Sequence, residues 1–191
     1  CGPNLLGYGF APVEAAAAAQ QAKGDSMTGP SEIMVDLAET MVGMVSHAEW
    51  AIFCKNGTDA TSIAIVTARA QTGRGKILYA AGAYHGAAAW CTPRPAGILP
   101  EDRAHIVYYD YNDPQSLADA FKAHEGDVAG VIATPFLHEV FRDQADPNRE
   151  FALAARQLCD QHGAMLIVDE VRAGFRLARD CTWAAYGVAP D

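Results

Sequence analysis

Apolar residues follow two alternating patterns along most of the chain, short continuous runs and longer stretches in which they recur every three or four residues. The short runs predict buried strands, and the longer stretches predict amphipathic helices. Strands that alternate with helices indicate an α/β fold of three layers, in which helices flank a mostly parallel sheet. The predicted strands are Trp50–Cys54, Lys76–Ala80, His105–Tyr109, Val128–Ala133 and Ala164–Asp169, and the predicted helices between them are Thr58–Gln71, Pro114–His124 and Arg149–His162.

The first 46 residues have a different pattern. Residues 1–30 are rich in Gly, Ala and Pro, with one predicted helix over Val13–Lys23. A second helix is predicted to begin near Ser31. Its apolar residues have the spacing of one buried face, and they are Ile33, Leu37, Met41, Met44 and Val45. We therefore predict an N-terminal segment with a loop and a linking helix over residues 1–46, followed over residues 47–191 by the first part of a large ligand-binding domain.

Three polar segments follow predicted strands, at the ends where parallel sheets bind ligands. The first is Asn56-Gly57-Thr58, at the start of a predicted helix. Gly57 allows a ligand to approach the backbone closely, and Thr58 suits the N-cap position and carries a hydroxyl. The free N–H groups and the dipole of a helix N-terminus favour an anion. The segment predicts a phosphate site, with a plain helix cap as the alternative.

The second segment is Tyr84-His85-Gly86, which follows the predicted strand Lys76–Ala80. An aromatic ring at a strand end can stack on a flat ligand. The same triplet also fits a core tyrosine whose hydroxyl is hydrogen-bonded. Both interpretations remain open from these residues alone.

The third segment is Asp169, which follows the apolar run Leu166–Val168. A carboxylate at the end of a buried strand loses water and needs a partner. Asp169 is therefore either a ligand-binding residue or a capping or salt-bridged aspartate. The Walker B carboxylate of a nucleotide hydrolase also fits the pattern, but the loop GxxxxGK[ST] that this class requires is absent from the sequence.

Composition and charge narrow the classes of function. Half of the 191 residues are apolar and 19% are charged, as in an ordinary globular protein. The formal net charge of −9 argues against a nucleic-acid or membrane partner. The 5 cysteines and 6 histidines lack metal-ligand spacing, so we predict no metal site and free thiols in the reducing cytoplasm. No apolar run is long enough to cross a bilayer.

Together the three segments describe one ligand. It has a phosphate for Gly57 and Thr58, a flat aromatic ring for Tyr84 and a basic ring nitrogen for Asp169. Pyridoxal 5′-phosphate (PLP) has all three features. An aspartate keeps the ring nitrogen protonated, because an opposite charge favours the charged form. The protonated ring is then an electron sink.

The chain closely resembles the class III aminotransferases of PLP fold type I, which include the ω-transaminases and glutamate-1-semialdehyde aminomutase. The resemblance runs through nearly the whole chain in the family's order. The segment Gly174–Ala178 favours the aminomutase-like branch. The matching stretches are Gly2–Gly9, Glu32–Glu39, Asn56–Ala60, Ala70–Arg74, Tyr84–Gly86 and Leu166–Phe175.

The resemblance implies cofactor-binding roles for six residues. Gly57 and Thr58 would bind the phosphate, Tyr84 would stack on the pyridine ring with His85 beside it, Asp169 would pair with the ring nitrogen, and Val171 would pack on the other face of the ring. It also implies that residues 47–191 are the first part of a PLP-binding large domain, whose remainder and small C-terminal domain are absent. A homodimer with active sites at the subunit interface is the expected assembly.

Some positions depart from the family's pattern and leave the amine substrate open. Thr134-Pro135 stands where the family usually has Glu-Pro, and Glu139 is a candidate replacement for the missing glutamate. Arg172 stands where a neutral side chain is common.

The lysine that would form the Schiff base with PLP is not evident in the chain. None of Lys23, Lys55, Lys76 and Lys122 follows Asp169. The family's order places this lysine beyond Asp191, so we expect an internal piece of a longer protein that is inactive by itself.

The resemblance implies transfer of an amino group between an amine or amino acid and a keto acid or aldehyde. One alternative is an intramolecular aminomutase of the glutamate-1-semialdehyde type, and another is an amino-acid epimerase on the same scaffold. An alternative of another class is a non-catalytic α/β protein that binds PLP or phosphate without the lysine.

Overall fold

The computed structural model describes residues 4–24, 29–137 and 145–191. The chain forms two compact units, Cys1–Ile52 and Phe53–Asp191. The predicted boundary between residues 46 and 47 concerns the domains of the complete protein and stays a prediction.

The second unit is built on a four-stranded parallel sheet in the order β2-β1-β3-β4. Its strands are β1 (Lys76–Ala80), β2 (Ile106–Tyr109), β3 (Val128–Ala133) and β4 (Met165–Val168). Every residue of β3 is buried, as expected for a central strand that is covered on both faces. The four matching strand predictions are confirmed, with bounds that differ by one residue at most.

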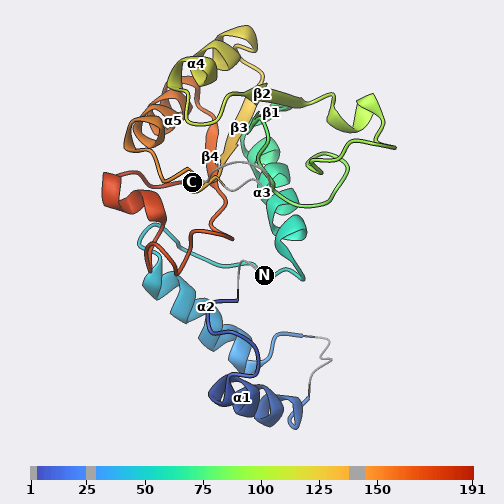
Figure 1. Ribbon diagram of the computed structural model, residues 1–191, viewed down its shortest axis with the longest axis vertical. Helices are drawn as coiled ribbons and strands as arrows, with labels where there is room; N and C mark the ends of the chain where they lie inside the picture. The colour runs from blue at the N-terminus through green and yellow to red at the C-terminus, as the bar shows by residue number, and fades with distance from the viewer. Residues whose placement is uncertain (1–3, 25–28, 138–144) are drawn as a thin grey trace. The chain divides into compact units, whose positions relative to one another are not determined.

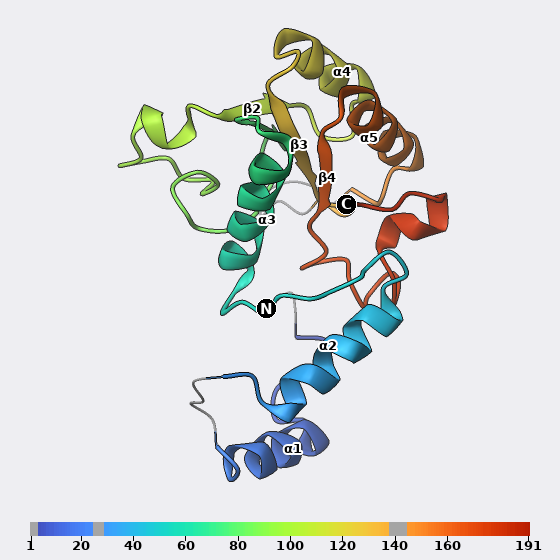
Figure 2. The same cartoon turned by 180° about the vertical axis from the view of Figure 1, so that it is seen from behind.

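Helices cover both faces of this sheet and complete the predicted three-layer α/β fold (Figures 1 and 2). α3 (Gly57–Thr72) lies on one face, while α4 (Pro114–Ala123) and α5 (Arg149–His162) lie on the other. A Cβ added at Gly130 of β3 would lie 3.4 Å from Ala68 Cβ of α3 and 2.9 Å from Met165 O. Glycine at this position therefore allows α3 and β4 to pack closely on the central strand.

Short polar residues begin these helices, and glycines end α3 and α5. Asp113 caps α4 by accepting from Gln115 N and Ser116 N, and Asn148 caps α5 by accepting from Phe151 N. Gly163 ends α5 in the left-handed conformation with φ 61°. The 3-10 helix η1 (Pro100–Arg103) lies between β1 and β2, and the 3-10 helix η2 (Thr182–Tyr186) follows β4.

The predicted strand Trp50–Cys54 is wrong. These residues are neither strand nor helix, and the side chains of Trp50, Ile52 and Phe53 are exposed. A run of apolar residues indicates a tendency to be buried, whereas a strand also needs a neighbour that accepts and donates ladder hydrogen bonds.

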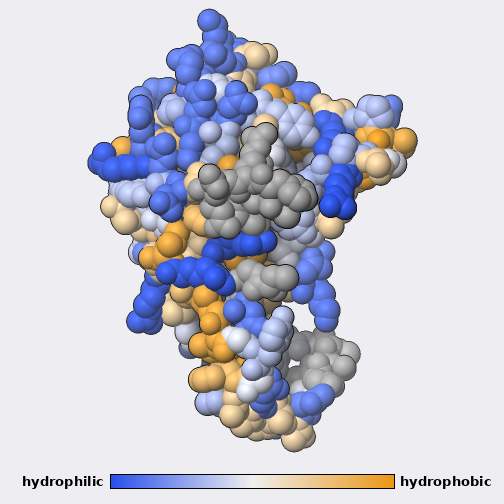
Figure 3. Space-filling model, viewed as in Figure 1, coloured by the Kyte–Doolittle hydropathy of each residue, from blue (hydrophilic) through white to orange (hydrophobic). Residues whose placement is uncertain are grey.

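The first unit contains α1 (Ala11–Gln21) and α2 (Glu32–Met44), and neither helix has a buried residue. Both helices confirm the sequence prediction, but the predicted burial of one α2 face is wrong for the described chain. Leu37, at the centre of that face, is 47% exposed. A helical period identifies an apolar face without identifying what covers it. Apolar residues are accordingly prominent on the surface of the part that holds α2 (Figure 3).

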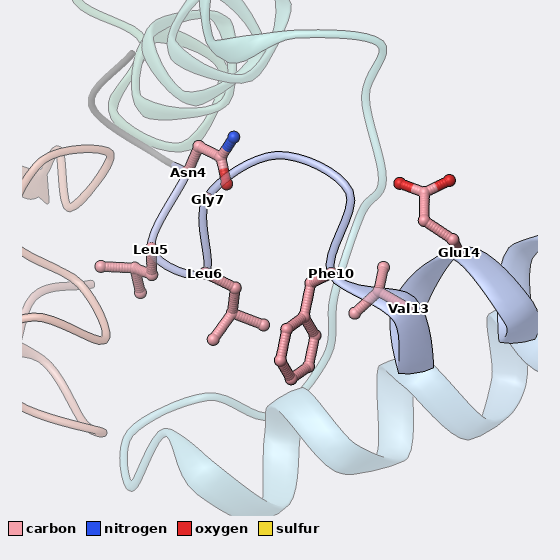
Figure 4. Close-up of a pocket in the computed structure, with 7 residues that line it drawn as sticks. All are labelled: Asn4, Leu5, Leu6, Gly7, Phe10, Val13 and Glu14. Atoms are coloured by element: carbon pink, nitrogen blue, oxygen red, sulfur yellow. The ribbon is translucent and has the colours of Figure 1, made fainter.

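A cavity of about 320 Å³ lies beside the start of α1 in the same unit. Leu6 and Phe10 point to the same side of the chain, whereas the carboxylate of Glu14 points away from them (Figure 4). The residues that line the cavity are Asn4, Leu5, Leu6, Gly7, Phe10, Val13 and Glu14.

None of the helices in the described ranges is long and apolar enough to cross a membrane.

Candidate functional site

The predicted ligand-binding segments meet at the carboxyl edge of the sheet. β1 leads into the turn that carries Tyr84 and His85, and β4 ends one residue before Asp169. α3 begins at the same edge, where a Cβ added at Gly57 would lie 3.5 Å from Val171 Cγ2. Parallel strands bring their carboxyl ends together, which explains how segments so distant in the sequence become neighbours.

The start of α3 leaves backbone donors open for a ligand. The helix begins at Gly57, and Asn56 is its N-cap: Asn56 Oδ1 accepts from Asp59 N at 3.0 Å. The expectation that Thr58 is the N-cap is therefore wrong by two residues, because the amide side chain of Asn56 reaches the N3 position first. A helix supplies no carbonyl to its first N–H groups. Those of Gly57 and Thr58 are therefore available to an anion at the positive end of the helix dipole.

Thr58 also contacts the turn after β1. Its Oγ1 accepts a hydrogen bond from Ala87 N at 3.1 Å. Gly86 packs directly on Thr58: a Cβ added there would lie 2.6 Å from Thr58 Oγ1. A hydroxyl that accepts one bond still has its own proton to donate, so Thr58 retains a donor for a ligand oxygen.

Tyr84 and His85 are neighbours in the turn but have opposite environments. Tyr84 is 51% exposed, which excludes the alternative that it is a core tyrosine. Its ring is available for stacking on a flat ligand. His85 is 2% exposed, and its ring packs edge-on against Tyr79 with centroids 4.9 Å apart.

Asp169 is held from two sides. Its Oδ2 lies 2.8 Å from His85 Nδ1, and its Oδ1 accepts from Val171 N at 3.0 Å. A carboxylate only accepts, so Nδ1 of His85 carries the proton in this bond. Nε2 of His85 is buried and has no hydrogen-bond partner among the described residues.

The donor set fits PLP. The N-terminus of α3 suits a dianionic phosphate, the exposed Tyr84 ring suits a flat heterocycle, and the Asp169 carboxylate suits a protonated ring nitrogen. Val171 is also exposed at this edge and offers an apolar contact. The structure brings all six predicted residues to one edge of the sheet, and their individual roles stay predictions.

The positions that depart from the family's pattern, Thr134, Glu139 and Arg172, differ in their surroundings. Thr134 is buried directly after β3, where its hydroxyl lies 3.2 Å from Phe136 O and its carbonyl accepts from Tyr111 OH at 3.0 Å. It therefore lies at the same sheet edge as the candidate site. Arg172 is half-buried, and Glu139 lies outside the described residues.

Glu170 is a residue that sequence reasoning missed. Its two carboxylate oxygens accept from Thr182 N at 2.7 Å and from Thr182 Oγ1 at 2.8 Å. These bonds tie the residue after Asp169 to the start of η2, and so close the loop that begins with Val171. The carboxylate beside Asp169 is visible in the sequence, but no local pattern identifies a partner twelve residues away.

Other reactive side chains do not form a second centre in the described part of the chain. Cys91, Cys159 and Cys181 are buried, and burial raises the pKa of Cys159 and of Cys181 to about 12. Cys54 is only partly buried. The described residues hold no group of three or more His, Cys, Asp or Glu side chains that could bind a metal ion.

A family model and the similar proteins of known sequence agree on one family. The family model described as "Aminotransferase class-III" matches residues 2–191. The whole chain is 66% identical to the aminopentol aminotransferase of Sphingopyxis macrogoltabida and covers 45% of that protein. It is 36% identical to a glutamate-1-semialdehyde 2,1-aminomutase of Leptothrix cholodnii, of which it covers 47%. The chain thus spans about half the length of the curated relatives that it matches.

A solved structure also superimposes closely. The FumI protein of Sphingopyxis sp. MTA144, in its PLP internal aldimine form, matches with a TM-score of 0.96 and 66% identity. The match covers 100% of this chain and 46% of that one.

Proposed function

Because this chain belongs to the class-III aminotransferase family, we propose that the complete protein is a PLP-dependent aminotransferase. It would move an amino group between an amine or amino acid and a keto acid or aldehyde. The observation that carries the proposal is the His85–Asp169 pair, at 2.8 Å, beside an exposed aromatic ring and an open helix N-terminus. The 66% identity to an aminotransferase supports it.

In this proposal each residue has a defined task. Gly57 and Thr58 bind the phosphate through backbone N–H groups and the Thr58 hydroxyl. Tyr84 and Val171 contact the ring. Asp169 holds a proton on the ring nitrogen, and His85 fixes the orientation of the carboxylate. When bound, PLP supplies an electron sink for the substrate's reacting carbon.

The lysine that binds the cofactor covalently is proposed to lie beyond Asp191. Among the lysines of the chain, Lys76 donates to Ala104 O at 2.8 Å, and it opens β1 at the opposite edge of the sheet. Lys55 is exposed and precedes the N-cap of α3. The 191 residues alone are therefore expected to be inactive.

The amine substrate is proposed from the most similar of the relatives described above. The protein of S. macrogoltabida is named for an aminopentol, so an aminopentol is the first amine to test. An intramolecular aminomutase is the second candidate, favoured by the Gly174–Ala178 segment and by 36% identity to an aminomutase. The identity to the aminotransferase is higher, and we give that function priority.

The assembly, organisation and location of the complete protein follow the same proposal. Residues 1–46 form an N-terminal segment and residues 47–191 the first part of the PLP-binding domain.

We propose a homodimer, supported by the uncovered apolar face of α2. A cytoplasmic location is supported by the free thiols of Cys54, Cys91, Cys159 and Cys181. The net charge of −9 gives no support for a nucleic-acid or membrane partner.

Titration of the complete protein with PLP tests the proposal. We expect a visible absorbance band that saturates with PLP and disappears on borohydride reduction, because borohydride reduces the bond between a lysine and the cofactor. Replacement by alanine of the lysine proposed to lie beyond Asp191 should abolish the absorbance band of the covalently bound cofactor and all amino-group transfer. A protein that stays colourless at saturating PLP would refute the enzyme and leave the non-catalytic alternative.

A further inference from the structure

The turn that carries Tyr84 and His85 is attached to α3 over its first two turns. The helix residues involved are three and four positions apart, so they share one face of α3. Three hydrogen bonds make the attachment: Thr61 Oγ1 to His85 O at 2.7 Å, Ala87 N to Thr58 Oγ1 at 3.1 Å, and Trp90 Nε1 to Ser62 Oγ at 3.0 Å.

Thr61 makes the shortest of these bonds. Its side chain is buried with the residue 7% exposed, and the carbonyl of His85 that it reaches is also buried. The hydroxyl lies near Gly57 O and Thr58 O as well, at 3.0 and 3.2 Å. It has a single proton. The contact with His85 is the shortest of the three and joins two separate segments of the chain, whereas the other two lie within the first turn of α3.

Tyr79 holds the same turn from β1. Its hydroxyl lies 2.7 Å from Ala83 O and 3.1 Å from Cys91 O, and its single proton can bond either of these carbonyls, which flank the turn. Burial raises the pKa of Tyr79 well above its usual value, so the hydroxyl keeps the proton that it donates. The His85 and Tyr79 rings pack against each other in a T-shaped arrangement. His85 is therefore fixed through its backbone by Thr61 and through its ring by Tyr79.

We propose that Thr61 is a positioning residue of the cofactor site, which locks the turn bearing Tyr84 and His85 onto the helix that binds the phosphate. This inference rests on the proposed function. Thr61 would touch no part of the cofactor. It acts through His85, whose Nδ1 donates to Asp169, and through the position of Tyr84. Without its hydroxyl, the two parts of the site that bind the ring and the phosphate are no longer held at a fixed separation.

The test compares variants of the complete protein by PLP titration of the apo form. Thr61→Val removes the hydroxyl and keeps the shape, and it should weaken PLP binding about tenfold, because PLP must then order a turn that is no longer held in place before binding. Thr61→Ala should give a loss of similar size and shows whether the valine methyl group matters. Thr61→Ser keeps the hydroxyl, and its affinity should stay within about twofold of the wild type.

Thr72→Val is the matched control. Thr72 Oγ1 donates to Ala68 O at 2.8 Å, the same back-bond to the fourth preceding residue, at the far end of α3. Its removal should leave PLP affinity unchanged. The pH dependence of the visible band of bound PLP is the second readout. It should shift in Thr61→Val and not in Thr72→Val, because only Thr61 acts on the His85–Asp169 pair.

The outcomes separate this inference from the proposed function. Wild-type protein that binds PLP, together with Thr61→Val and Thr61→Ala that bind it equally well, would overturn the positioning role even if both variants unfold more easily. A serine variant as weak as the valine variant would also overturn it. Wild-type protein that binds no PLP would refute the proposed function itself, and the inference with it.

Discussion

Asp169 is the residue on which most of the proposed chemistry depends. Its two oxygens are each engaged, by His85 Nδ1 and by the backbone N–H of Val171, and its side chain is only 9% exposed. Such an arrangement holds a negative charge at one place before any ligand arrives. Preorganised charge of this kind is worth more in a site that excludes water than in solution.

Replacement of Asp169 by asparagine should retain PLP binding and lower turnover by at least about a hundredfold, because an amide cannot supply the charge that keeps the ring nitrogen protonated. Steady-state kinetics and PLP titration of the complete protein measure the two effects. Asp110→Asn is the control, since Asp110 is an exposed aspartate after the neighbouring strand β2. Near wild-type turnover in Asp169→Asn would mean that this carboxylate is structural.

Single residues of the site were predictable where their chemistry is local. Asp169 follows an apolar run, and Gly57-Thr58 lies at the start of a predicted helix, so both could be identified from the sequence. The partners of these residues were not predictable, because a 2.8 Å bond between positions 85 and 169 depends on which strands are neighbours in the sheet. The N-cap was misplaced because Asn56 and Thr58 both suit that position, and only the start of the helix decides between them.

At the scale of elements, the contact between α3 and the turn after β1 determines the shape of the site. Gly86 lies at the point of closest approach, with φ of +131°. A side chain there would meet three atoms of Thr58, namely Oγ1 at 2.6 Å, Cβ at 2.9 Å and Cα at 3.0 Å. Glycine at this position therefore serves both the backbone conformation and the packing.

Gly86→Ala should destabilise the protein by about 2–4 kcal/mol, from backbone strain and overpacking together, and should weaken PLP binding because Thr58 must move. Gly97→Ala is the control that measures backbone strain without overpacking. Gly97 also has a positive φ, +82°, but a Cβ there would have no atom within 4 Å. Denaturant unfolding and PLP titration should show the larger loss in Gly86→Ala. Equal losses in both variants would show that the close contact with Thr58 contributes nothing.

The elements themselves were largely predictable from periodicity. Four strands and three helices of the second unit match their predicted places, because buried strands and amphipathic helices leave strong local patterns. The exception is residues 50–54, which are apolar but do not form a strand paired with another strand. Pairing depends on distant segments, which a local pattern does not contain.

At the scale of the whole molecule, the first unit presents apolar surface that the described chain leaves open. α1 and α2 have 11 and 13 residues, and neither buries a side chain. Helices of this length are marginal in water, and packing of an apolar face normally stabilises them. The apolar surface of the first unit therefore needs another surface packed against it, which we propose to be a second copy of the protein.

Leu37→Asp in the complete protein should shift the dimer towards monomer. A charge in the centre of a covered apolar face is uncompensated, and a cost of about 3 kcal/mol would weaken the dimer by roughly a hundredfold. Val35→Asp is the matched control: it places the same charge on α2, and Val35 is similarly exposed at 51% against 47%. Two positions along a helix correspond to a rotation of about 200°, so Val35 lies on the opposite face. Sedimentation over a range of protein concentrations measures the equilibrium. A Leu37→Asp protein that remains dimeric but unfolds more easily than Val35→Asp would show that the rest of its own chain covers this face.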